Sequence, residues 1–94
     1  MNVKDSLLNL LAEEACEVAQ NALKCVRFTT EHRYYEASNL ERLNTELSDV
    51  ASVIKMLQDI GVDVKFEASE KKIASIKQYM DVSRSMGALD VDAA

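Results

Sequence analysis

The chain has 94 residues, which is enough for one domain, and 48% of them are hydrophobic. Its 16 acidic and 11 basic residues give a formal net charge of -5 at pH 7, so its surface should repel the phosphate backbone of nucleic acids. We therefore expect no nucleic-acid partner.

The sequence also disfavours membrane and secreted classes. No stretch is long and apolar enough to span a membrane, and the first eleven residues lack the cleavage pattern of a secretory signal. The two cysteines, Cys16 and Cys25, are too few for a disulfide framework and do not have the spacing of zinc ligands. We expect a cytoplasmic protein that makes no membrane contact.

The absence of proline and the presence of only two glycines predict long helices and an all-α fold. Apolar residues at steps of three and four predict a first helix over residues 3–28 and a second over 39–60. Residues 29–38 break this pattern and predict a loop, with Ser38 or Asn39 as the N-cap of the second helix and Gly61 as its C-cap. A third helix is predicted over 66–85, which completes a domain of residues 1–85 and leaves 86–94 as a C-terminal tail.

Two acidic motifs interrupt the apolar faces of the first two helices. At about 100° per residue, Glu14 falls within the apolar arc of the first helix, with Glu17 one turn further on at its edge. Glu46 has a similar place among the apolar residues of the second helix, and Asp49 lies just to one side. Two antiparallel helices would bring these four carboxylates into one interior.

Carboxylates in an apolar interior must be neutralised, because an unpaired buried charge costs several kcal/mol. Hard oxygen ligands at this density favour Mg²⁺ or Mn²⁺. Two other interpretations remain open: a solvated acidic face, and an ion-pair network within a non-catalytic helical interaction module, for which the basic partners would be Lys24, Arg27, Arg42 and Lys55. A ferritin-like diiron site is disfavoured, because it needs Glu-x-x-His pairs and the single histidine, His32, lies in the predicted loop.

The acidic motifs and their surroundings resemble the all-α nucleoside triphosphate pyrophosphohydrolases of the MazG-like group. That family carries EExxE on one helix and ExxD on the next. The chain matches both motifs within Leu11-Ala12-Glu13-Glu14-Ala15-Cys16-Glu17-Val18 and Thr45-Glu46-Leu47-Ser48-Asp49-Val50. The resemblance covers roughly residues 5 to 85 and suggests a short, single-domain member.

The resemblance implies hydrolysis of a (deoxy)nucleoside triphosphate to a nucleoside monophosphate and pyrophosphate, in control of the nucleotide pool. It implies Mg²⁺ as the cofactor, with Mn²⁺ as a substitute. The residues that match the family's acidic motifs would be the metal ligands Glu14, Glu17, Glu46 and Asp49, with Glu13 as the residue that orients or deprotonates the attacking water.

The substrate also needs cations and aromatic rings outside the acidic motifs. Lys24 and Arg27 follow the first motif on the same helix, and Lys77 lies on the third helix; these are the candidate phosphate contacts, although basic residues near helix ends often only complement the helix dipole. Tyr79 is a candidate for contact with the base, with Phe28, Tyr34 and Tyr35 as further rings that are more often core or interface.

The hydrophobic fraction is high for so short a chain, and three helices cannot cover it alone. We therefore expect a homodimer or homotetramer that completes a helical bundle between subunits.

Overall fold

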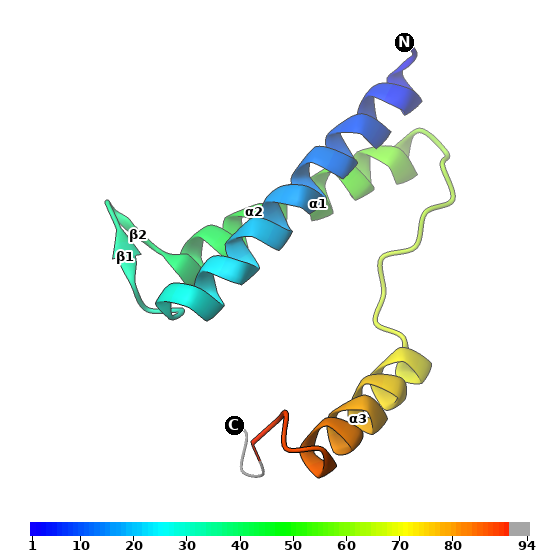
Figure 1. Ribbon diagram of the computed structural model, residues 1–94. Helices are drawn as coiled ribbons and strands as arrows, with labels where there is room; N and C mark the ends of the chain where they lie inside the picture. The colour runs from blue at the N-terminus through cyan, green and yellow to red at the C-terminus, as the bar shows by residue number, and fades with distance from the viewer. Residues whose placement is uncertain (91–94) are drawn as a thin grey trace.

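The computed structural model describes residues 1–90. Three helices, α1 (Val3–Phe28), α2 (Asn39–Asp59) and α3 (Glu70–Ser85), account for about 70% of these residues, and two short strands, β1 (Arg33–Tyr34) and β2 (Ala37–Ser38), form a hairpin (Figure 1). The prediction of a mostly helical chain is confirmed. No helix in this part of the chain has both the length and the apolar character needed to cross a membrane.

Polar side chains cap the start of each helix. The Asn2 side chain accepts a hydrogen bond from the Asp5 amide at 2.7 Å, and the Ser38 hydroxyl accepts one from the Glu41 amide at 3.0 Å. Ser69 caps α3 in the same way, accepting from the Lys72 amide at 3.1 Å. This cap explains why α3 begins at Glu70 and not at residue 66 as the apolar pattern predicted.

Glycine ends α2. Gly61 has a φ of +87°, and the amides of Gly61 and Val62 donate to the carbonyls of Gln58 and Leu57, which is the Schellman arrangement. Gly61 therefore lies one residue beyond the C-cap, Ile60, in the left-handed conformation that a residue without a Cβ adopts at low cost.

The segment predicted as a loop contains the β1–β2 hairpin. Arg33 pairs with Ser38 and Tyr34 with Ala37 in antiparallel register, and the Asn39 amide, at the start of α2, donates to the His32 carbonyl. Strands of two residues are too short to produce an alternating pattern, so the sequence carried no sign of them.

α1 and α2 lie side by side and antiparallel, with the hairpin at one end (Figure 1). The core between them is small, because Leu7, Ile54 and Leu57 are the only fully apolar side chains classed as buried among residues 1–90.

Residues 60–69 extend away from α2, and α3 stands apart from the helical pair (Figure 1). The radius of gyration is 16.8 Å, whereas a globular domain of this length would have about 12 Å. The predicted tail lies partly outside the described residues, since only residues 86–90 of it are described, and these turn back over the end of α3 through hydrogen bonds from Gly87 and Ala88.

Candidate metal and nucleotide site

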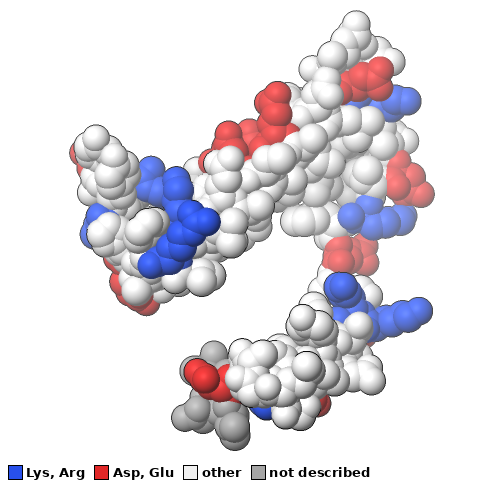
Figure 2. Space-filling view, in the orientation of Figure 1, with Lys and Arg blue, Asp and Glu red and all other residues white. Residues whose placement is uncertain are grey.

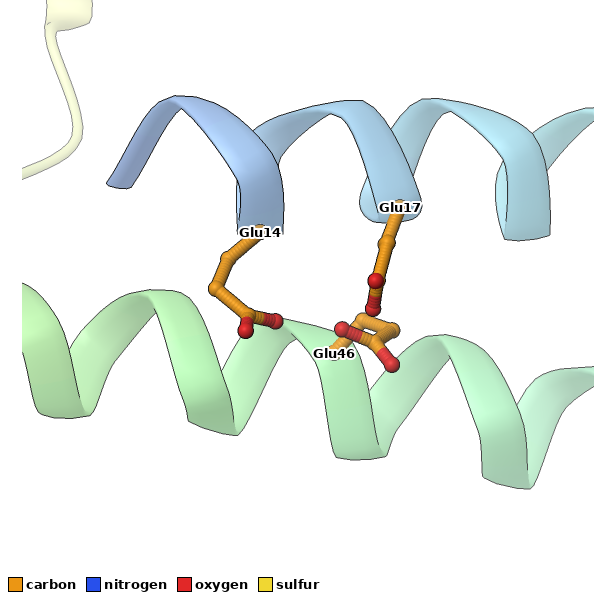
Figure 3. A group of neighbouring side chains, drawn as sticks. All are labelled: Glu14, Glu17 and Glu46. Carbon is orange, nitrogen blue, oxygen red and sulfur yellow. The ribbon is translucent and has the colours of Figure 1, made fainter. Parts of the chain in front are cut away.

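Three glutamates from the facing sides of α1 and α2 meet between the two helices. Glu14 and Glu17 project from successive turns of α1, and Glu46 projects from α2 toward them (Figure 3). One carboxylate oxygen from each lies within 4.8 Å of the others. We call these residues the three-glutamate cluster.

Two of the carboxylate oxygens in the cluster are buried without a partner. Glu14 and Glu46 are both half-buried, and Oε2 of each has no hydrogen-bond partner among the described residues. The four ion pairs in this part of the chain join other groups, so no basic side chain neutralises the cluster. The sequence left open that Lys24, Arg27, Arg42 or Lys55 would do so; Lys55 instead pairs with Asp59 at 2.7 Å.

The proximity of the acids perturbs Glu46 most. Its pKa is raised to about 7, first by the neighbouring Glu14 carboxyl, with which it can share a proton, and then by burial and by Glu17. A carboxyl that keeps its proton near neutral pH marks a place where negative charge is crowded. Such a place is suited to a cation.

Two other predicted acids lie beside the cluster. Asp49 is half-buried on α2, one turn beyond Glu46, and is not among the carboxylates that meet within 4.8 Å. Glu13 precedes Glu14 on α1 and is exposed to solvent. The structure thus brings three of the five acids of the two motifs into one group.

A cleft of about 320 Å³ opens beside the cluster. Its walls include Glu17 and Glu46 together with two cations, Lys24 from α1 and Arg42 from α2. Lys24 was predicted as a phosphate contact. Arg42 was considered only as an ion-pair partner, although it precedes Glu46 by four residues, which places both on one face of α2.

Lys24 and Arg42 also line a second, larger cleft of about 560 Å³ toward the hairpin, whose other walls are Phe28, His32, Tyr34 and Asn39. The two clefts therefore adjoin. Figure 2 shows basic side chains gathered where the hairpin meets the ends of the helices, and acidic side chains further along α1. The sequence predicted neither cleft, because both clefts depend on how α1, the hairpin and α2 are placed next to one another.

The remaining predicted contacts are not brought to these clefts within one chain. Arg27 is exposed in the last turn of α1 and lines neither cleft. Lys77 and Tyr79 lie on α3, apart from the α1–α2 pair (Figure 1).

Comparison of the chain with models of known protein families, with curated proteins and with solved structures found no match.

Proposed function

We propose that this protein is a Mg²⁺-dependent nucleoside triphosphate pyrophosphohydrolase, which converts a (deoxy)nucleoside triphosphate and water to the monophosphate and pyrophosphate. The observation that carries the proposal is the three-glutamate cluster, with its two buried, unpartnered carboxylate oxygens beside a cleft lined by cations. The resemblance of the EExxE and ExxD motifs to the MazG-like group supplies the reaction type.

The donor set fits a hard divalent cation, because it consists only of carboxylate oxygens and two of them lack any other partner. Glu14, Glu17 and Glu46 would hold the ion, and Asp49, one turn away on α2, is the candidate fourth ligand. Bound Mg²⁺ would neutralise the acids and polarise phosphate oxygens.

The chain's own side chains have the remaining roles. Lys24 and Arg42 lie where they can neutralise phosphate oxygens next to the acids. Glu13 is exposed next to Glu14, and in this proposal it orients or deprotonates the attacking water. Cleavage between the α- and β-phosphates follows from the resemblance, since the acids alone would serve other phosphoryl chemistry as well.

The proposal includes an oligomer. The accessible surface of the chain is 7495 Å², whereas a folded monomer of 10.5 kDa would expose about 5400 Å². The excess, about 2000 Å² per chain, is of the size buried in stable homodimers. Large apolar side chains are exposed on all three helices, among them Leu23 and Val26 on α1, Met56 on α2 and Ile76 on α3.

Packing of α3 against the α1–α2 pair of a second copy would cover these surfaces and complete a helical bundle. It would also give Lys77 and Tyr79 a route to a substrate held by the partner. Arg27, at the exposed end of α1, would likewise be free to contact a phosphate of the substrate in the oligomer.

A non-catalytic interaction module remains the second candidate function. The exposed apolar helix faces favour it. It also requires basic residues that neutralise the acids, and no ion pair to the cluster is present among residues 1–90. Calorimetric titration with Mg²⁺ separates the two candidates, since only the enzyme should show stoichiometric binding.

The proposed reaction is tested by phosphorus NMR on the eight common NTPs and dNTPs with Mg²⁺. Pyrophosphate and a nucleoside monophosphate should appear together. Glu14→Gln should abolish turnover and leave the fold intact, whereas Glu67→Gln, which removes the same charge from the exposed connection to α3, should leave turnover unchanged. Orthophosphate with a nucleoside diphosphate as the first products would contradict the proposal.

A further inference from the structure

The larger cleft is built differently from the one beside the acids. It lies between the end of α1, the hairpin and the start of α2, and its volume of about 560 Å³ is within the range of small-molecule sites. Its walls combine aromatic rings with two cations and contain no carboxylate. This composition suits a ligand with a flat face and an anionic group.

Two rings of this cleft are exposed and stand on a backbone that is hydrogen-bonded. Phe28 is 55% exposed and lies 6.2 Å from the His32 ring, at 39° between the planes, and Tyr34 is 61% exposed. The backbone beneath them is fixed by Asn39, which is only 4% exposed and whose Nδ2 donates to the Thr29 carbonyl at 2.9 Å. Exposed rings on a fixed backbone offer a surface on which a flat ligand can stack.

Arg42 joins this cleft to the cluster. Its guanidinium lies 5.9 Å from the centre of the Tyr34 ring and donates to the Tyr34 carbonyl, while its buried Nε has no partner among residues 1–90. The side chain is therefore held against the hairpin, in a cleft wall that it shares with Glu46, with hydrogen-bonding capacity unused. Lys24 lines both clefts from the opposite helix.

The spacing along α1 suits an extended ligand. At 1.5 Å per residue, Lys24 lies about 10 Å beyond Glu17, and Phe28 about 16 Å beyond it. A ligand that reached from the acids to the rings would pass over Lys24 and Arg42 on the way. Along this path the protein presents metal-binding acids, then cations, then rings. This order matches the parts of a nucleoside triphosphate, read from its metal-bound phosphates to its base.

We infer that the cleft between α1 and the hairpin binds the nucleoside part of the substrate, with Phe28 and Tyr34 contacting the base and Lys24 and Arg42 contacting the phosphate chain. This inference rests on the proposed function, because it takes the three-glutamate cluster as the metal end of the same ligand. It assigns Arg42, Phe28 and Tyr34 a substrate contact that the acidic motifs do not predict.

The test compares a triphosphate ligand that carries a nucleoside with one that does not. An α,β-methylene nucleoside triphosphate, which resists cleavage at the proposed bond, and inorganic triphosphate are titrated into the full chain with Mg²⁺. Phe28→Ala should weaken binding of the nucleotide about tenfold and change that of inorganic triphosphate by less than about twofold. Phe66→Ala is the matched control, because Phe66 is also 55% exposed but lies in the connection to α3.

Arg42→Gln should weaken both ligands by about tenfold, since both carry the phosphates that it contacts. Lys55→Gln removes the same charge from the same helix outside the clefts and should weaken neither. Phe28→Leu keeps an apolar side chain at the end of α1 and should reproduce the nucleotide defect; circular dichroism confirms that each variant is folded.

The inference is wrong if Phe28→Ala and Phe28→Leu leave nucleotide binding unchanged, or if they weaken inorganic triphosphate equally. These results are independent of turnover. If the Phe28 variants selectively lose nucleotide binding while the wild type releases no pyrophosphate, the inference is supported and the proposed reaction is contradicted. If the wild type releases pyrophosphate and the Phe28 variants bind the nucleotide normally, the proposed reaction is supported and the inference is contradicted.

Discussion

Magnesium binding should be coupled to the release of a proton from the three-glutamate cluster. The pKa of Glu46 is raised to about 7, chiefly by the neighbouring Glu14 carboxyl, and a metal ligand must be deprotonated. With a pKa of about 7, binding should release about 0.9 proton at pH 6, about 0.5 at pH 7 and about 0.1 at pH 8. The apparent affinity for Mg²⁺ should therefore fall about tenfold from pH 8 to pH 6.

The same pKa predicts the opposite pH dependence for the stability of the metal-free protein. Folding raises the pKa of Glu46 above its ordinary value of 4.5, so the folded state favours the neutral carboxyl. The stability that this group contributes is complete below about pH 4.5 and is lost as the pH rises through about 7. Glu46→Gln should therefore melt higher than the wild type at pH 8 and close to it at pH 5.

Isothermal titration calorimetry at pH 6, 7 and 8 measures the proton release, if each titration is repeated in two buffers with different ionisation enthalpies. Thermal melts of the metal-free wild type and of Glu46→Gln measure the effect on stability. Asp63→Asn, which removes an exposed charge far along the chain from the cluster, serves as the control. A proton release that is the same at all three pH values would refute the link between Glu46 and metal binding.

Three further predictions concern folding and assembly. Leu57→Ala should lower the free energy of unfolding by about 2 to 5 kcal/mol, because Leu57 is fully buried between α1 and α2, and a change below 1 kcal/mol in urea unfolding would show that this contact does not hold the pair. Gly61→Ala should cost about 1 kcal/mol although there is open space for a Cβ, since only the φ of +87° opposes it, and equal stability of the two proteins in the same assay would contradict that reason. Sedimentation at micromolar concentration should report a dimer or tetramer, and a fully active monomer would rule out the proposed assembly.

The helices could be predicted from the sequence because their signals are local. Apolar spacing gave α1 and α2 nearly to the residue, and Ser38 was one of two expected N-caps. The start of α3 was placed too early, because Phe66 extends the apolar pattern while the capping hydroxyl of Ser69 sets the first turn. The hairpin was missed because its strands have only two residues each.

The candidate site could be predicted only in part. The helical arc of Glu14 and of Glu46 indicated that both face the interior. The structure has both half-buried between α1 and α2, next to Glu17, which is exposed. Which acids meet depends on how far α1 and α2 are shifted along each other. The apolar pattern of one helix contains no information about this shift, so the position of Asp49 outside the group was not predictable. The same is true of Arg42, whose place beside Tyr34 depends on the hairpin.

The connection between α2 and α3 bears on how long an assembly would last. Residues 60–69 can span at most about 35 Å, so an α3 helix docked on a neighbouring chain stays tethered to its own α2. In a reciprocal dimer, an α3 helix that dissociates remains near its docking surface at a local concentration of about millimolar as long as the other α3 helix stays bound. Separation then requires both helices to be free at once, so subunits should exchange slowly even if each helix binds weakly.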